Sequence, residues 1–295
     1  MLQAAKRQAW VLNFDDSAGQ PQHSAQLELQ DWQEDIRFSC NWKTFRQFSN
    51  LLEQQLPTAS ELGCVLLGSG DYHHVTQALL SRLDPKQPIH LIVCDNHPDN
   101  MRYPLGIHCG SWVYWASRLP QVARIDVIGI SSADISVAHA WENHCLPLIR
   151  GKLHYWSVKQ SAAWTRWVGA KAAWHGYEDP NQLMQDFIGQ LDHDLPIYLS
   201  IDKDVFSQQV VQTNWDQGNF VEQNLLDLID ACAGRLIGAD ITGDVSAYRY
   251  KSLLKRMLSA GDGQSEPSEA DVKLWQVEQQ QLNDRLITAI DQQWR

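Results

Sequence analysis

The sequence predicts a three-layer α/β/α domain with a mostly parallel central sheet, and two observations support this fold class. Short apolar runs rich in β-branched residues recur along the chain, and segments with helical spacing lie between them. Strands that alternate with helices form a parallel sheet whose two faces are covered. The expected strands are 64–68, 90–94, 124–130, 153–158, 197–201 and 236–241, and the helices between them include 75–83, 112–119, 183–191 and 225–233.

The 295 residues are expected to form one domain (1–295) with additions at both ends. Residues 1–40 contain two strand-like pieces around a turn signal, which predicts a β-hairpin or an extension of the sheet edge. Residues 259–268 contain two glycines and a proline, which indicates a linker. Ser268 is then expected to cap a last helix, 269–295, with its apolar side chains in one stripe.

Composition excludes several classes of function. Thirty-five acidic residues against 24 basic residues give a net charge of −11, which argues against binding to nucleic acid. Neither an export signal nor an apolar run of about 18 residues, the length of a membrane span, is present. Six scattered cysteines without a C-x-x-C pair fit a reducing compartment. We therefore expect a cytoplasmic protein that acts on a small molecule.

Metal-binding side chains follow the strand predicted at 90–94. Asp95, His97 and Asp99 occupy every second position after this strand. In open α/β sheets, ligands bind at this carboxyl edge. Pro98 favours an extended conformation at His97, and an extended chain would turn the three side chains toward one point. The segment therefore predicts a tripod of metal ligands.

A second pair of carboxylates, Asp202 and Asp204, follows the strand predicted at 197–201. Four clustered aspartates would repel one another strongly unless divalent cations neutralised them. Carboxylates with imidazoles and no thiolate suit Mn²⁺, Fe²⁺ or Zn²⁺, and the excess of carboxylates favours Mn²⁺. Two such ions could bridge and deprotonate one water, and the resulting hydroxide would be the nucleophile of a hydrolysis. We therefore expect a binuclear manganese centre.

Two further segments bring histidines to the same edge. A glycine-rich bend, Gly68 to His74, follows the strand at 64–68, and either His73 or His74 could complete the first metal's ligands. The register of the helix that follows slightly favours His73. His108 lies on the loop after the tripod, so we expect it to transfer protons at the site.

At these residues the chain resembles the arginase and agmatinase family, the ureohydrolases. The family's signatures are a Gly-Gly-Asp-His bend, an Asp-Ala-His-x-Asp strand end and a Ser-x-Asp-x-Asp strand end, and the matching segments here are 70–74, 95–99 and 200–204. The resemblance implies an arginase-like fold, two metal ions and a proton-shuttling role for His108. It implies one metal held by His73 or His74 with Asp95, Asp99 and Asp202, and the other by Asp95, His97, Asp202 and Asp204.

The chain departs from the family where substrate is bound. The glutamate that binds the guanidinium group in the family has no counterpart in segment 238–246, where Asp244 is the nearest substitute. Segment 213–218, which contains Trp215 and Asp216, stands where the family carries a Pro-Gly element. Arg102 and Tyr103 lie where relatives hold the far end of the substrate. Arg102 could recognise a carboxylate there, or it could be an exposed arginine with no role.

The expected function is hydrolysis of a linear C–N bond in a guanidino, formimino or related compound by a metal-bridging hydroxide. One alternative is a deacetylase-like amidohydrolase, in which His73 and His74 would form the pair of histidines at the base site. A second alternative is an inactive scaffold that has kept the metals. Members of the family assemble as trimers or hexamers, so the resemblance also implies a homo-oligomer.

Overall fold

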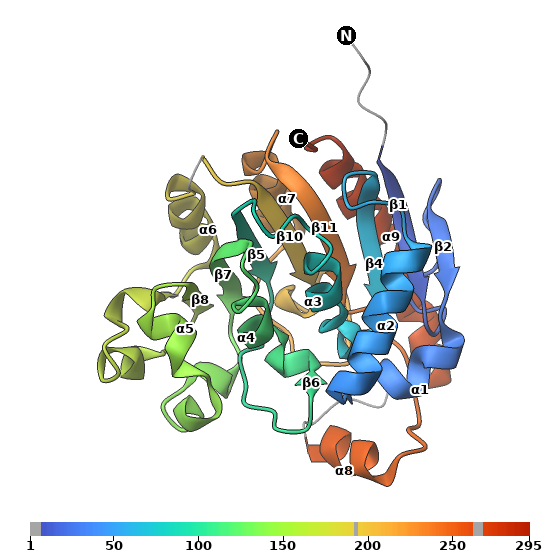
Figure 1. The fold of residues 1–295 in the computed structure, drawn as a ribbon. Coiled ribbons are helices and arrows are strands. Elements are labelled where there is room, and N and C mark those ends of the chain that lie inside the picture. Colours follow the sequence, from blue (N-terminus) through green and yellow to red (C-terminus); the bar gives the residue numbers. More distant parts are fainter. Residues whose placement is uncertain (1–6, 192–193, 262–267) are drawn as a thin grey trace.

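A parallel sheet forms the centre of the molecule in the computed structural model, which describes residues 7–191, 194–261 and 268–295 (Figure 1). Among these residues the sheet has nine strands in the order β2-β1-β4-β11-β10-β5-β7-β8-β9, and every neighbouring pair is parallel. The strands are β1 (Gln8–Asn13), β2 (Ala25–Glu28), β4 (Leu62–Gly68), β5 (Ile89–Cys94), β7 (Val122–Ile130), β8 (Leu153–Val158), β9 (Trp174–Tyr177), β10 (Ile197–Asp202) and β11 (Leu236–Thr242). A separate antiparallel pair joins β3 (Ser39–Cys40) to β6 (Ile107–His108).

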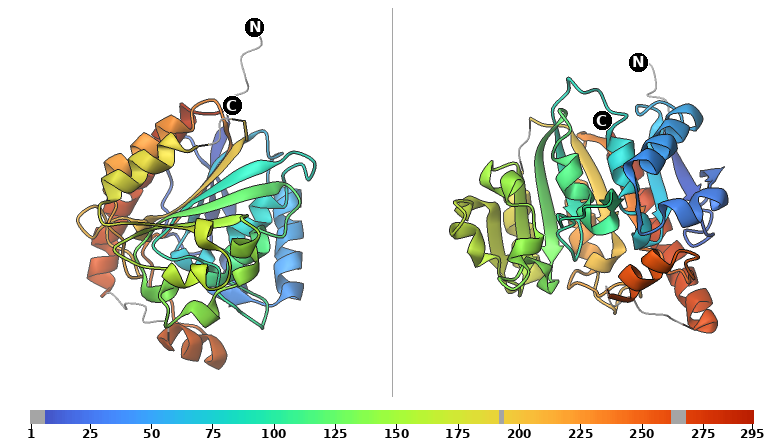
Figure 2. Two further views of the ribbon diagram at one scale, coloured as in Figure 1. Left: turned by 90° about the vertical axis from the view of Figure 1, so that its left-hand side faces the viewer. Right: turned by 60° about the horizontal axis from the view of Figure 1, so that its bottom comes forward.

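Helices cover both faces of the sheet (Figures 1 and 2). One apolar core lies under α2 (Trp42–Gln55), α3 (Val75–Leu80), α4 (Trp112–Ala116) and α5 (Cys145–Ile149), and the other under α6 (Pro180–Gly189), α7 (Glu222–Ala231) and α9 (Glu269–Asp291). Two short helices, α1 (Gln33–Ile36) and α8 (Leu253–Gly261), complete the set in the described ranges. The predicted three-layer α/β/α class with a parallel sheet is confirmed.

The two ends of the chain differ in part from expectation. β1 and β2 pair in parallel, with Trp10 opposite Ala25, so they extend the sheet edge beyond β4 and are not a hairpin. Helix α8 continues through Gly261, so the first residues of the expected linker are helical, while 262–267 fall outside the described residues. The Ser268 side chain accepts a hydrogen bond from the Asp271 backbone N–H at 3.2 Å, and α9 then runs to Asp291.

Strand register places the predicted metal ligands together. β4, β11, β10 and β5 are adjacent in the middle of the sheet. Ile201 of β10 pairs with Cys94 of β5, so Asp202 and Asp95 leave their strands at the same level. Across the described residues, no helix combines the length and the apolar character that crossing a membrane requires.

Candidate metal centre

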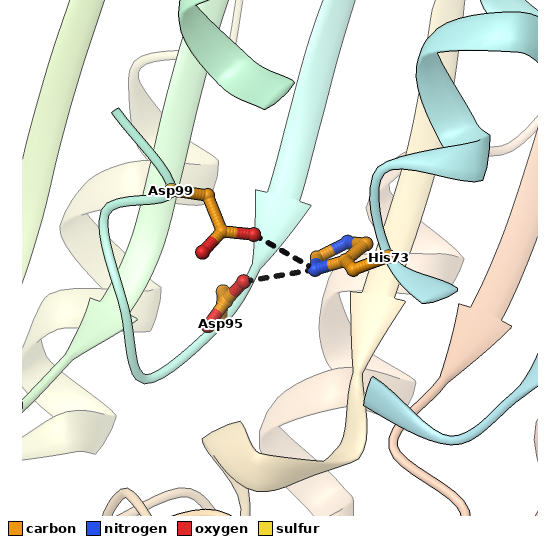
Figure 3. Close-up of side chains that lie close together, drawn as sticks. All are labelled: His73, Asp95 and Asp99. Atoms are coloured by element: carbon orange, nitrogen blue, oxygen red, sulfur yellow. Dashed lines mark ion pairs between the residues drawn. The ribbon is translucent and has the colours of Figure 1, made fainter. Parts of the chain in front are cut away.

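His73, Asp95 and Asp99 form the first group of potential metal ligands (Figure 3). His73 Nδ1 lies 3.0 Å from Asp99 Oδ2, 3.2 Å from Asp95 Oδ2 and 3.5 Å from Asp202 Oδ2. His73 comes from the bend after β4, the two aspartates follow β5, and Asp202 ends β10. Three strand ends therefore supply oxygen and nitrogen atoms around one buried point.

Asp95, His97 and Asp204 form the second group. His97 Nδ1 lies 2.9 Å from Asp204 Oδ2 and 3.6 Å from Asp95 Oδ1. Asp95 thus presents one carboxylate oxygen to each group, as a carboxylate shared between two ions would. Asp202 lies beside the first group, and its Oδ1 accepts a hydrogen bond from the Asp204 backbone N–H at 3.1 Å.

A chain of buried hydrogen bonds orients His73. The Ser200 hydroxyl donates to Asp240 Oδ1 at 2.7 Å, so its oxygen is left to accept from His73 Nε2 at 3.0 Å. Asp240 also accepts hydrogen bonds from Thr76 and Tyr198, which fix its position. With Nε2 committed to Ser200, Nδ1 is the imidazole nitrogen that faces the carboxylates.

The electrostatics of these groups fit a divalent cation. Burial, and then the charge of Asp95, raises the pKa of Asp99 to about 7 and that of Asp202 to about 6. Burial alone would lower the pKa of His73, but the carboxylates of Asp95 and Asp99 raise it well above its ordinary value. Among the described residues, His73 Nδ1 and Asp95 Oδ2 are buried without a hydrogen-bond partner. A cation between these atoms would satisfy both and offset the repulsion of the aspartates.

The segment after β5 is not extended throughout, in contrast to the expectation from Pro98. Asp99 adopts a left-handed backbone conformation, with φ of 44°, which aspartate tolerates better than most residues. This turn directs the carboxylate back toward His73, and Asp99 Oδ2 also accepts a hydrogen bond from Trp112 Nε1 at 2.6 Å. The tripod therefore converges through a turn in the chain.

The two adjacent histidines have different positions. His73 and His74 follow one another in a helical turn, where successive side chains point about 100° apart, so only one of them faces the strand ends. His74 is fully buried, its ring centroid lies 6.1 Å from that of Phe45, and it belongs to neither group of ligands. Burial lowers the pKa of His74 well below its ordinary value. Within the part of the chain that the structure describes, the geometry thus brings His73, and not His74, to the carboxylates.

His108 lines the same cavity as both groups of ligands. Its Nδ1 accepts a hydrogen bond from the Gly110 backbone N–H at 2.8 Å, and its ring packs at 80° to Phe38 with centroids 4.3 Å apart. In the neutral imidazole, Nε2 therefore carries the proton. Burial lowers the pKa of His108 to about 3, so the ring is neutral at pH 7.

Asp244 does not reach the cavity, which corrects its expected role in binding substrate. Its carboxylate forms a fully buried ion pair with Lys203 and accepts a hydrogen bond from Asn283 Nδ2 at 3.1 Å. Lys203 Nζ also donates to Asn283 Oδ1 at 2.8 Å. A buried lysine needs such a partner, so Asp244 connects β10 and β11 to α9.

Arg102 and Tyr103 also lie outside the cavity lining. Met101 bridges to Asn143 and faces the cavity, so its neighbour Arg102 points the opposite way in this extended segment. The exposed Arg102 guanidinium donates to the Asn143 carbonyl at 3.2 Å. The Tyr103 hydroxyl donates to Ser39 Oγ at 3.0 Å.

Several cavity residues were missed from the sequence. The cavity has a volume of about 400 Å³, which suits a small molecule. Its outer wall includes residues of two loops: Ser132, Asp134, His139 and Glu142 between β7 and α5, and Trp215 and Asp216 between β10 and α7. His139, which had no recognisable context in the sequence, pairs with Glu142 at 3.1 Å. Within the described ranges, seven carboxylates and no lysine or arginine line the cavity.

Comparison with known proteins places this geometry in a known fold. No protein-family model matches the chain. An uncharacterized protein of Thermotoga maritima is 28% identical over 200 residues, which cover 68% of this chain and 64% of that protein. The chain thus spans less than two thirds of this relative's length.

Solved structures resemble almost the whole chain. The agmatine ureohydrolase of Thermoplasma volcanium matches with a TM-score of 0.56 and 12% identity over 98% of this chain and 90% of that one. The proclavaminate amidino hydrolase of Streptomyces clavuligerus matches with a TM-score of 0.54 and 14% identity, covering 98% and 94%. The formimidoylglutamase of Bacillus subtilis matches with a TM-score of 0.50 and 13% identity, covering 99% and 88%. The chain is therefore a divergent protein with the arginase (ureohydrolase) fold, as its strand-end motifs predicted.

Proposed function

We propose that this protein is a two-metal hydrolase that cleaves a linear C–N bond in a guanidino, formimino or related small compound. The observation that carries the proposal is Asp95, whose two carboxylate oxygens face His73 on one side and His97 on the other. A carboxylate placed in this way suits two neighbouring cations. The structural neighbours are named agmatine ureohydrolase, proclavaminate amidino hydrolase and formimidoylglutamase, and these names agree with this class of reaction.

Six side chains are proposed to hold the metals. The first ion would be held by His73, Asp95, Asp99 and Asp202, and the second by Asp95, His97, Asp202 and Asp204. Two bound divalent ions, which we propose to be Mn²⁺, would supply Lewis acidity and activate a water for hydrolysis near neutral pH. Ser200 and Asp240 keep His73 in the tautomer that a ligand requires, and Asp216 Oδ1 does the same for His97 by accepting from Nε2 at 2.8 Å.

His108 is proposed to assist proton movement at the leaving nitrogen. The hydrogen bond from Gly110 to Nδ1 leaves Nε2 as the nitrogen that carries the proton. Because Nε2 already carries a proton and Nδ1 accepts from Gly110, His108 would act first as a hydrogen-bond donor from Nε2. It would take up a proton only at Nδ1, with loss of the Gly110 hydrogen bond, when negative charge that develops beside the buried ring favours its charged form. His108 would therefore be protonated only in the reacting complex, where such negative charge develops.

The charge of the cavity bears on the class of substrate. Four aspartates are needed for the metals, which leaves Asp134, Glu142 and Asp216 as additional carboxylates in the lining. Arg102 points away, so no cation in the described lining is available to hold a substrate carboxylate. We therefore propose that the substrate is cationic at the site.

The alternatives receive less support. A deacetylase-like site would need both histidines of the 73–74 pair, but His74 packs beside Phe45 outside the cavity. An inactive scaffold that keeps the metals would need the same hydrogen bonds to His73 and His97, but it would not need the cavity of about 400 Å³ that His108 lines beside the ligands. The test is to load purified protein with Mn²⁺, measure the metal content, and assay release of urea or ammonia from a panel of guanidino and formimino compounds. Two metals per chain with no hydrolysis of any compound would favour the scaffold.

A further inference from the structure

We propose that Trp215 and Asp216 form the binding wall for the planar, cationic end of the substrate. This inference rests on the proposed function in one respect, because it takes the cavity at the metal centre as the substrate site. The two residues lie on the loop between β10 and α7, and both line the cavity. The wall would recognise a delocalised cation, such as a guanidinium or amidinium group.

The end of β11 does not supply a side chain that could bind the cationic end of the substrate. No side chain from β11 or from Asp244 lines the cavity among the described residues. Gly243 has a positive φ of 89°, and a Cβ atom there would collide with Asp202 Oδ1. A carboxylate side chain at position 243 is therefore sterically excluded. Asp244 is paired with Lys203, so recognition of a cation has to come from another element.

Trp215 is held beside both groups of metal ligands. A Cβ atom at Gly70 would lie 3.1 Å from Trp215 Cδ1 and 3.2 Å from Asp202 Oδ2, so the missing side chain lets the indole pack against the bend. The Phe38 ring lies nearly parallel to the indole, at 5° and 6.5 Å between centroids. The His97 ring lies 5.9 Å away at 70°. These contacts fix an aromatic surface on the cavity wall close to the reacting centre.

Asp216 adds negative charge beside this surface. Its Oδ1 accepts from His97 Nε2 at 2.8 Å, and its Oδ2 accepts from Asn96 Nδ2 at 3.0 Å. The Asn96 amide also donates to the Asp216 backbone carbonyl at 2.9 Å, which fixes the residue on both sides. The side chain of Asp216 remains 65% exposed, and a carboxylate has about four acceptor sites, so capacity is left for a substrate N–H.

An aromatic ring beside a carboxylate, as in Trp215 and Asp216, favours a planar cation over other small molecules. An aromatic face attracts a cation through the quadrupole of the ring, and a flat delocalised cation can stack on that face. A carboxylate at the edge accepts hydrogen bonds from the same group. A neutral molecule of the same shape gains only part of this attraction, and an anion would be repelled by Asp216.

Direct binding to the Mn²⁺-loaded protein tests the inference without depending on turnover. Calorimetry would compare guanidinium chloride, agmatine and the neutral planar molecule urea. Trp215→Leu should weaken binding of both cations about tenfold, whereas Trp215→Phe should stay within about threefold because it keeps an aromatic face. Trp167→Leu is the matched control, since Trp167 is 78% exposed and lies outside the cavity lining.

A second variant separates charge from the orientation of His97. Asp216→Asn keeps one oxygen that can accept from His97 Nε2, but it removes the negative charge and the acceptor for Asn96 Nδ2. It should retain the manganese content and weaken binding of both cations about tenfold, with little change for urea. Metal content and melting temperature would be measured for every variant.

The outcomes also distinguish this inference from the proposed activity. Cation binding that depends on Trp215 supports the inference even if the protein hydrolyses nothing, a result that would overturn the proposed activity. Hydrolysis with unchanged cation affinity in Trp215→Leu and Asp216→Asn would overturn the inference and leave the activity intact. Binding of urea as tightly as guanidinium, or binding of neither cation by the wild-type protein, would also overturn it.

Discussion

The floor of the cavity, where the metal ligands lie, could be predicted from the sequence, whereas its outer wall could not. The floor consists of short motifs directly after strands, namely His73, Asp95, His97, Asp99, Asp202 and Asp204. The outer wall consists of loops whose cavity residues are far apart in the chain, such as Asp134 and Trp215. Parallel register determines where a strand ends, but it does not determine how a long loop folds over that end. The strand-end motifs therefore predicted the floor, whereas the residues of the outer wall could be assigned to the cavity only from the folded structure.

The largest effect is expected from the shared carboxylate of the floor. Asp95→Asn removes a charge that faces both groups of ligands, so the variant should lose at least one of two bound Mn²⁺ ions and nearly all activity. Bound metal stabilises the native state by mass action, so the manganese-induced rise in melting temperature should shrink. Elemental analysis and thermal melts with and without manganese provide the measurement.

The matched control for Asp95→Asn is Asp227→Asn, the same substitution at an exposed position on α7. It should keep the full response to manganese. If Asp95→Asn responded to manganese as the wild-type protein does, Asp95 would not be a ligand, and the assignment of the floor would have to be abandoned.

The next effect concerns His108, which lines the cavity without belonging to either group of ligands. His108→Asn should keep the metal content and the melting temperature while turnover falls about 10²–10⁴-fold, the usual contribution of a proton-transferring group. Steady-state kinetics on whichever panel compound is hydrolysed, with metal analysis of the same samples, would measure this. Unchanged turnover would make His108 a packing residue, and loss of metal would make it a ligand.

A smaller effect is expected from Ser200, which does not contact the metals but holds the ligand His73 in place. Ser200→Ala removes the oxygen that accepts from His73 Nε2 and one donor to Asp240. Loss of such an outer partner weakens metal affinity by about 10–100-fold. Competition with a fluorescent chelator would measure it, and Ser81→Ala, at an exposed position after α3, is the control. Equal affinities in the two variants would show that Ser200 does not orient the ligand.

These differences explain how much the sequence could predict. The six expected strands all occur, because apolar runs bounded by polar residues identify buried strands, and their ends located the ligands. The register of the helix after the bend favoured His73 over His74, but the residue types alone could not separate the two. Asp244 was misassigned because its partner Asn283 is 39 residues away on α9. His139 was missed, and Asp216 was noted only as part of segment 213–218, because only the folded loops bring these residues to the cavity.

The smallest effect is expected from Arg102, and it tests whether the outer wall has been assigned correctly. The sequence left open whether Arg102 recognises a substrate carboxylate or has no role. In the structure its backbone N–H donates to the Glu142 carbonyl at 2.7 Å and its guanidinium donates to the Asn143 carbonyl, so the side chain is directed away from the cavity.

Removal of an exposed side chain of this kind has little energetic consequence, so Arg102→Ala should change kcat/KM by less than about twofold. The measurement should use pairs of guanidino compounds that differ only in a distal carboxylate, with Arg118→Ala, another exposed arginine, as the control. A selective increase in KM for the carboxylate-bearing member of each pair would show that the loop at 101–103 turns Arg102 inward when substrate binds. In that case the cavity would recognise an anion at its mouth, and the preference for a purely cationic substrate inferred from the seven carboxylates of the lining would be wrong.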